Sequence, residues 1–457
     1  MSQLTVDIDL VRKYNVAGPR YTSYPPATKF SESTRWPQLA EELIANNREA
    51  RDLSLYFHVP FCESLCWYCG CNTVITKDHG QSRIYLDHLE MQMKQMNALL
   101  HPAREVVQLH FGGGTPTFLE PNEILGLGHK IYSMFNISPR LEAGVEIDPR
   151  RLTRQHISAL RTIGFNRASI GVQDFDPVVQ KAVHRIQPFE MTQIAIDWIR
   201  EAGFKSLNID LIYGLPHQDV ASFERTIDQV LTLNPDRIAL FSYAHVPWLK
   251  HSQRALEKYL PTAEQKLKIF KMAVEKLTAN DNYVYIGMDH FAKPKDSLAL
   301  AQRTRRLHRN FQGYSTHGGA DIYAFGVSGI SQTENAYWQY EKELPRFYSE
   351  LEAGRAPVSK GYIVSEDDRI RRETIMRIMC DLSLNFGQIA DKFGIDFATY
   401  FARELEALAP MEKDGLIRFT SFGFEVTSTG RLLIRNIAMS FDAYYNTESE
   451  KRFSRTI

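Results

Sequence analysis

A unit of short apolar run, turn and amphipathic stretch recurs from about residue 53 of this 457-residue chain. The apolar runs are β-branched or aromatic and end at turn residues, as buried parallel strands do. They span 53–59, 106–111, 143–147, 167–172, 206–214 and 237–246, with a weaker seventh at 283–288. Helical stretches such as 85–100 and 263–277 lie between them. Strand–helix alternation builds parallel sheets with right-handed crossovers, so we expect an α/β fold, a partial (β/α)6 TIM-like barrel.

Two regions depart from this alternation. Residues 1–36 contain GPRYTSYPP (18–26), which is too rich in Pro and Gly for regular structure, and we expect an N-terminal arm. Residues 37–365 form the predicted barrel domain with an extension, and residues 366–457 form a mainly helical C-terminal domain. In that domain two helical stretches precede GLIRFTSFGFEVTSTGRLLI, which indicates a β-hairpin and a final helix. This order resembles a winged helix.

The charge balance excludes some classes of protein. The chain holds 54 basic and 54 acidic side chains, and residues 366–457 hold 13 and 15, so neither has the basic excess of a nucleic-acid binder. No apolar stretch reaches the ~18 residues of a membrane span, and the start, MSQLTVDIDL, does not resemble a secretory signal. We therefore expect a cytoplasmic protein that binds neither nucleic acid nor membrane, with a polar balance compatible with a monomer.

Four of the five cysteines fall within ten positions, in HVPFCESLCWYCGC at the end of the first predicted strand. In a reducing compartment, thiols clustered in this way are more often metal ligands or catalytic groups than disulfides. Zinc usually takes two separated Cys pairs, and an electron-carrying ferredoxin has four thiolates at other spacings. Three thiolates on a 4Fe–4S cluster would leave one iron open to a substrate or cofactor. Cys380 stands alone and is expected to be a small buried hydrophobe.

The Cys62-x3-Cys66-x2-Cys69 motif resembles that of the radical S-adenosylmethionine (SAM) superfamily, with Tyr68 as the aromatic residue before the third cysteine. HFGGGTP (110–116), EIDPR (146–150), GVQDF (171–175) and NIDLIYGLP (208–216) also resemble barrel segments of that superfamily, in the same order. Within it, the whole chain resembles the oxygen-independent coproporphyrinogen III oxidases. The supporting segments are GPRYTSYPP (18–26), the CGC triplet, IGMDHFA (286–292) and HRNFQGYSTH (308–317).

The resemblance implies a site on this chain. Cys62, Cys66 and Cys69 would ligate a 4Fe–4S cluster, and Cys71 would not. One SAM site would comprise Tyr56, Gly112, Glu146 and Ile330. A second, SAM-like site would comprise Tyr68, Gly113, Gly114, Gln173, Arg185, Asp210 and Ala244. The alternative for Gln173 or Asp210 is a structural role, in which the side chain forms hydrogen bonds with buried backbone groups.

The resemblance also implies an activity in haem biosynthesis. SAM cleavage would give a 5′-deoxyadenosyl radical that abstracts hydrogen from a propionate of coproporphyrinogen III, and loss of CO2 would leave a vinyl group. Two such events would give protoporphyrinogen IX, with the low-potential electron supplied by a flavodoxin- or ferredoxin-like donor. The substrate carries four carboxylates, for which the candidate cations are Arg20, Arg185, His290, His308 and Arg309. The alternative is a haem chaperone of the same superfamily, which typically has Cys-x-Phe where this chain has Cys69-Gly70-Cys71.

Overall fold

The computed structural model describes residues 4–47 and 51–445, so residues 1–3 of the predicted arm and 446–457 of the predicted C-terminal domain lie outside the described residues. Its centre is a twelve-stranded sheet in the order β16-β15-β14-β13-β1-β4-β5-β6-β7-β8-β10-β9. Six consecutive strands of this sheet are parallel, which confirms the predicted units. They are β1 (Leu53–Val59), β4 (Glu105–Gly113), β5 (Asn136–Ile147), β6 (Arg167–Gln173), β7 (Ser206–Tyr213) and β8 (Arg237–Ser242). The last strand is shorter than the 237–246 expected.

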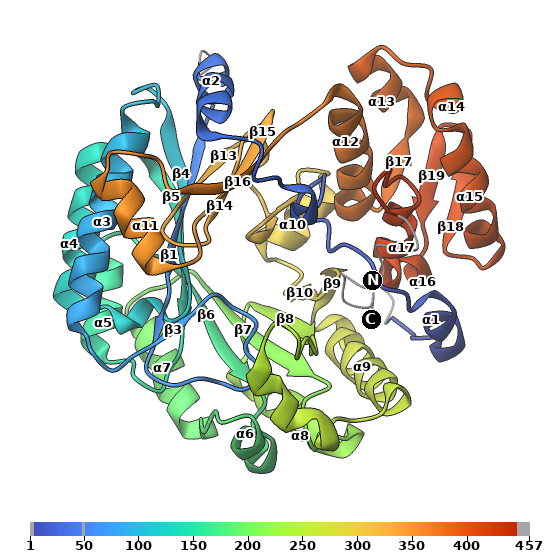
Figure 1. Cartoon of the computed structure of the whole chain (residues 1–457). Coiled ribbons are helices and arrows are strands. Elements are labelled where there is room, and N and C mark those ends of the chain that lie inside the picture. The colour runs from blue at the N-terminus through green and yellow to red at the C-terminus, as the bar shows by residue number, and fades with distance from the viewer. Residues whose placement is uncertain (1–3, 48–50, 446–457) are drawn as a thin grey trace.

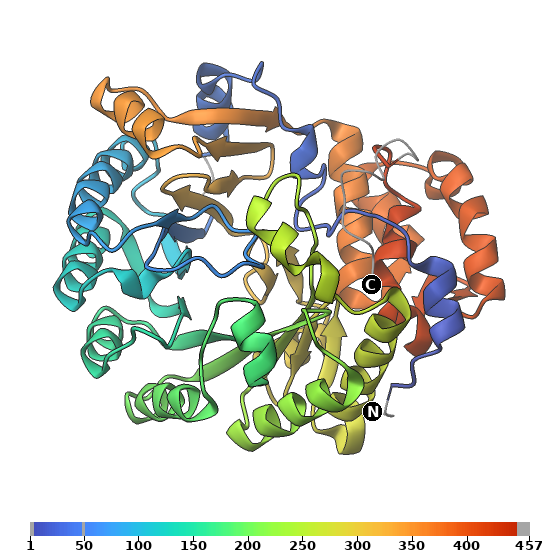
Figure 2. The same cartoon turned by 60° about the horizontal axis from the view of Figure 1, so that its bottom comes forward.

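Helices cover the outer face of the curved sheet (Figures 1 and 2). Residues of its inner face line a cavity. The covering helices are α3 (Gly80–Asn97), α4 (Pro121–Met134), α5 (Arg154–Thr162), α7 (Phe189–Glu201), α8 (Val220–Leu233) and α9 (Ala263–Thr278). The short α6 (Pro177–Ala182) packs instead in a small cluster with Tyr243 and Leu256, which follow β8. Helix α9 begins at a Thr262 cap that accepts a hydrogen bond from the Gln265 N–H. Its predicted apolar face is confirmed, since Leu267, Phe270, Val274 and Leu277 are all buried.

The barrel does not close, because other strands extend both edges of the parallel sheet. Strand β13 (Asp321–Phe325) pairs in parallel with β1 and is followed by the antiparallel β14 (Ile330–Gln332), β15 (Ala336–Tyr340) and β16 (Val358–Ile363). At the other edge the weak seventh strand is present as β9 (Val284–Gly287), joined to β8 through the antiparallel β10 (His290–Ala292). The connecting region also holds α10 (Ser297–Arg303), the β11 (His308–Asn310) and β12 (Gly313–Ser315) hairpin, and α11 (Leu344–Glu352).

The N-terminal segment runs between the sheet and the C-terminal part of the chain (Figure 1). It contains α1 (Ile8–Tyr14), the short 3-10 helix η1 (Ala27–Lys29) and α2 (Trp36–Asn46), so the boundary expected at 36/37 falls inside α2. Residues 18–26 form neither helix nor strand, and the chain bends at residues 22–25. They are nonetheless held firmly, because Tyr21 and Tyr24 are buried and Tyr21 donates a hydrogen bond to Asp442 at 2.9 Å.

The C-terminal part has the helices and hairpin expected from its sequence. Its helices are α12 (Glu366–Asp381), α13 (Phe386–Phe393), α14 (Phe397–Tyr400), α15 (Ala402–Lys413), α16 (Ser428–Leu432) and α17 (Ile434–Met439). The hairpin of β18 (Ile417–Thr420) and β19 (Gly423–Val426) gains a third strand that the sequence pattern did not predict, β17 (Ser383–Asn385). Cys380 is buried, as expected. Within the described part of the chain, no helix is long and apolar enough to cross a membrane.

Candidate active site

One cavity of about 730 Å³ opens on the inner face of the parallel sheet. It brings together twelve of the fourteen residues predicted for the site: Tyr56, Cys62, Cys66, Tyr68, Cys69, Gly113, Gly114, Glu146, Gln173, Arg185, Asp210 and Ile330. Gly112 is buried behind Glu146, and Ala244 is exposed just past β8, so neither lines the cavity. The carboxyl ends of parallel strands are where such folds gather functional groups, which is why residues from distant motifs meet here.

The cysteines lie on a loop that begins at the end of β1. Short parallel strands, β2 (Phe61–Cys62) and β3 (Val74–Ile75), hold the two ends of this loop together. Lys250 Nζ donates to the Cys71 carbonyl at 2.6 Å, and Gln253 Nε2 donates to the Tyr68 carbonyl at 3.0 Å. These long-range contacts tie the loop to the segment after β8.

Two guanidinium groups face the sulfur of Cys66. Arg150 Nη2 donates to it at 3.4 Å and Arg185 Nη1 at 3.5 Å, while both arginines also bind Asp148, at 2.6 and 3.0 Å. Burial would raise the pKa of Asp148, but the two arginines outweigh it and hold the pKa far below its usual value. The Asp148 carboxylate therefore holds two guanidinium groups in place beside the Cys66 sulfur.

The other sulfurs have different surroundings. A hydrogen bond from Cys71 lowers the pKa of Cys69 to about 6, whereas burial raises the pKa of Cys62 to about 11 despite its 3.4 Å contact with Thr115 Oγ1. Of Cys62 and Cys69, Cys69 is therefore the more readily ionised. Within the described residues, no three His, Cys, Asp or Glu groups lie close enough together to hold a single metal ion.

Close approach of the backbone explains the three glycines that end β4. A Cβ at Gly112 would lie 2.8 Å from Glu146 Oε1, one at Gly113 2.7 Å from the His58 ring, and one at Gly114 2.6 Å from the Pro60 carbonyl oxygen. Gly113 also has a φ of 113°, which an L-residue rarely adopts. Larger residues at these positions would collide with the Glu146 carboxylate, the His58 ring and the Pro60 carbonyl.

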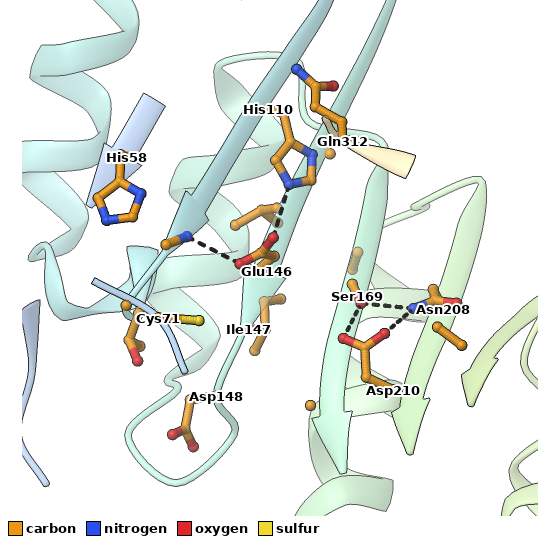
Figure 3. A pocket seen from close by; sticks show the side chains of 18 of the residues that line it. His58, Cys71, His110, Glu146, Ile147, Asp148, Ser169, Asn208, Asp210 and Gln312 are labelled. Atoms are coloured by element: carbon orange, nitrogen blue, oxygen red, sulfur yellow. Dashed lines mark hydrogen bonds and ion pairs between the residues drawn. The ribbon is translucent and has the colours of Figure 1, made fainter. Parts of the chain in front are cut away.

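Glu146 projects from the end of β5 into the cavity (Figure 3). Its Oε2 accepts the Gly113 N–H at 3.1 Å, and its Oε1 lies 3.3 Å from His110 Nε2. Burial raises the pKa of Glu146, but these two contacts reverse the effect and the pKa falls below its usual value. The Tyr56 ring stacks on His110 at 5.8 Å, so Glu146 is an anion held beside an aromatic wall.

Asp210 is held by a separate polar group. Ser169 Oγ donates to its Oδ2 at 2.9 Å, and Asn208 Nδ2 donates to its Oδ1 at 2.7 Å (Figure 3). Burial raises the pKa of Asp210 to about 6, although these two hydrogen bonds act to lower it. The side chain therefore changes charge near neutral pH.

This titration predicts a pH dependence of stability. A carboxyl group with a raised pKa binds more protons in the folded chain than in the unfolded chain, so its contribution is lost as pH rises from 3.8 to about 6. We expect Asp210→Asn to flatten this fall and to stabilise the ligand-free protein at neutral pH by up to about 3 kcal/mol. Urea unfolding measures the free energy of unfolding across this pH range, and Asp197→Asn on the exposed face of α7 is the control variant. Equal slopes in wild type and Asp210→Asn would contradict the assignment.

The structure adds residues that the sequence motifs did not single out. His110, Asp148 and Arg150 lie inside the quoted motifs, and Ser169 and Asn208 are polar residues at inward positions of buried strands. The detectable signal was a polar residue at every second position of an otherwise apolar strand.

The five candidate cations occupy different places. His290 lines the cavity, and Arg185 lies at Cys66. Arg20 pairs with Asp289, and the buried Arg309 donates to the Arg20 carbonyl at 3.2 Å. His308 lies outside the cavity lining, and its ring occupies the space beside Gly318.

Comparison with known proteins identifies the family. The family model for the radical SAM superfamily matches residues 56–230, and that for the HemN C-terminal domain matches residues 364–433. Proteins named oxygen-independent coproporphyrinogen III oxidase from Synechocystis sp. and Escherichia coli are 46% and 44% identical, over 98% and 100% of this chain and 97% and 100% of their own. The solved structure of E. coli coproporphyrinogen III oxidase (HemN), described as a radical SAM enzyme, aligns with a TM-score of 0.92 and 42% identity over 97% of this chain and 100% of that one. The chain therefore belongs to the oxygen-independent coproporphyrinogen III oxidases of the radical SAM superfamily.

Proposed function

We propose that this protein converts two propionate side chains of coproporphyrinogen III into vinyl groups, giving protoporphyrinogen IX for haem biosynthesis. The observation that carries the proposal is the meeting of the three motif cysteines, the glycine loop, Glu146 and Asp210 around one cavity. The full-length similarity to named coproporphyrinogen III oxidases supports the choice of substrate. Each conversion removes one hydrogen atom from the propionate, releases CO2 and passes one remaining electron to an acceptor.

The residues around the cysteines fit a 4Fe–4S cluster. Cys62, Cys66 and Cys69 would hold it, because all three line the cavity within one short segment and two arginines donate hydrogen bonds to the Cys66 sulfur. With SAM bound, such a cluster supplies the low-potential electron that yields the 5′-deoxyadenosyl radical. Cys71 lines the same cavity, and we assign it to the support of Cys69, to whose sulfur its N–H donates at 3.4 Å.

The remaining site residues would position SAM and the substrate. In the first SAM site, Glu146 would accept hydrogen bonds from ribose hydroxyl groups beside Tyr56 and Ile330. Gly112 has no side chain and so leaves room for the Glu146 carboxylate. The second, SAM-like site would comprise Tyr68, Gly113, Gly114, Gln173, Arg185, Asp210 and Ala244. Ala244 would contribute only from the rim, because it lies outside the cavity lining.

We further propose a cytoplasmic monomer that receives its electron from a flavodoxin- or ferredoxin-like protein. We also propose that the arm (1–36) and the C-terminal domain (366–457) cover the barrel domain (37–365). The course of residues 18–26 between sheet and C-terminal helices supports this division.

An anaerobic assay tests the function. Reconstituted protein with coproporphyrinogen III, SAM and a strong reductant should release two CO2 per substrate and form the divinyl product, followed by mass. SAM cleavage without loss of CO2 would reject the substrate and keep the superfamily chemistry. Tight stoichiometric haem binding without turnover would support the chaperone alternative instead.

A further inference from the structure

Four arginines and a histidine from distant segments converge at the open edge of the sheet. Arg20 comes from the arm, His290 from β10, Arg309 from β11, and Arg431 and Arg435 from α16 and α17. We call these five residues the arginine cluster. Figure 1 shows the arm, β9, β10 and α17 meeting in this region.

Within the described residues, backbone carbonyl groups accept hydrogen bonds from three arginines of the cluster. Arg435 Nε donates to the Pro19 carbonyl at 3.2 Å, Arg309 Nε to the Arg20 carbonyl at 3.2 Å, and Arg431 Nη2 to the Tyr285 carbonyl. Asp289 pairs with Arg20. Within the described residues, no carboxylate lies within ion-pairing distance of Arg309 or Arg431.

Three buried nitrogen atoms of the cluster have no hydrogen-bond partner in the described part of the chain. They are Arg309 Nη1, on a residue that is 4% exposed, Arg431 Nε and His290 Nδ1. A buried cationic group without a compensating hydrogen bond costs free energy, and burying it next to further cations costs more. Such an arrangement persists where an anionic ligand supplies the missing contacts.

The cluster lies directly behind the cavity wall. His290, Phe241 and Tyr314 line the cavity, and the His290 ring meets the other two edge-on at 6.2 and 5.4 Å. Arg20 lies over the Phe241 ring at 5.9 Å and Arg309 over the Tyr314 ring at 4.8 Å. The guanidinium groups of Arg20 and Arg309 thus lie against aromatic rings that line the same cavity as Asp210 and Glu146.

From this geometry we infer that the arginine cluster binds propionate carboxylates of the tetrapyrrole, with Arg309 and His290 as direct donors and Arg20 and Arg435 as supporting charges. The inference rests on the proposed function for the identity of the ligand. Carboxylates that bind here would hold one side of the macrocycle while a propionate on another side faces the cysteines. The aromatic rings of Phe241 and Tyr314 supply apolar surface for the pyrrole rings.

The electrostatics of the cluster agree with this role. Burial, together with the nearby arginines, lowers the pKa of Arg20 to about 9 and that of His290 to about 3. Both shifts come from positive charge that is desolvated without enough compensating negative charge. A bound carboxylate would raise both pKa values.

The experiment measures binding separately from turnover. Coproporphyrin III, the stable oxidised tetracarboxylate, is titrated into reconstituted protein with its fluorescence as readout, and its neutral tetramethyl ester is the matched ligand. We expect Arg309→Gln to weaken coproporphyrin III binding about 10- to 100-fold, as loss of a charge-assisted hydrogen bond does, and to leave ester binding unchanged. Arg309→Lys should recover part of the affinity. Arg306→Gln, an exposed neighbour, is the control variant.

Wild-type affinity for coproporphyrin III in Arg309→Gln would overturn the inference, as would an equal loss of ester binding. If Arg309→Gln does not fold, Arg20→Gln on the partly exposed arm is tested in its place, and an increase in KM for coproporphyrinogen III is expected. A wild-type protein that binds coproporphyrin III through Arg309 and forms no vinyl product would refute the proposed function and leave the carboxylate site standing.

Discussion

Replacing Cys62, Cys66 or Cys69 singly with alanine is expected to abolish both the iron–sulfur chromophore and SAM cleavage. Each sulfur lines the cavity from a different point of the segment that runs from β2 to β3, so no neighbouring group can take its place without moving this segment. The loss should exceed that of any other single substitution, because the electron has no route to SAM without the cluster. Iron and sulfide content per chain and the yield of 5′-deoxyadenosine measure the effect.

Cys71→Ser is the matched control for these variants. The hydroxyl group can still donate toward Cys69, and the backbone N–H of residue 71 keeps its contact with the Cys69 sulfur. We expect full iron content and a measurable rate of SAM cleavage. Loss of the cluster in Cys71→Ser, with retention in Cys62→Ala, would overturn the ligand assignment.

Gly114→Ala is expected to have the second largest effect. The added Cβ would lie 2.6 Å from the Pro60 oxygen, 2.7 Å from its carbonyl carbon and 2.8 Å from the Phe61 oxygen. These are backbone atoms that cannot rotate away, and they immediately precede Cys62. We expect a loss of about 1–3 kcal/mol in stability from overpacking. We also expect turnover to fall about 100-fold, as a displacement of ~1 Å in a site does.

Gly126→Ala in α4 provides the comparison, because a Cβ there meets nothing within 4 Å. Alanine in a helix should stabilise the protein by about 1 kcal/mol and leave turnover unchanged. Chemical unfolding and the anaerobic assay report both quantities. Turnover of Gly114→Ala within twofold of wild type would show that the loop before Cys62 tolerates the shift.

Several elements could be predicted because their signals are local. The six parallel strands follow from short apolar runs closed by turn residues, and the α9 face follows from 3.6-residue periodicity. The cysteine motif and the glycine loop each lie within one short segment, so their spacing is readable without knowledge of distant contacts. The strands that extend the sheet beyond β1 were not predicted, because strands such as β14 have only three residues, too few to show an alternating pattern.

The features of the site also fall into those that the sequence determines and those that the tertiary structure determines. The sequence by itself determined which residues follow each parallel strand, and therefore that Cys66, Glu146 and Asp210 meet at one end of the sheet. Only the tertiary structure decided that Asp148 directs two arginines at Cys66, and that Arg309 and Arg435 meet the arm beside His290. The physical reason is that periodicity records which side of its own element a residue faces. Charge pairing and desolvation depend on elements brought together from hundreds of residues away.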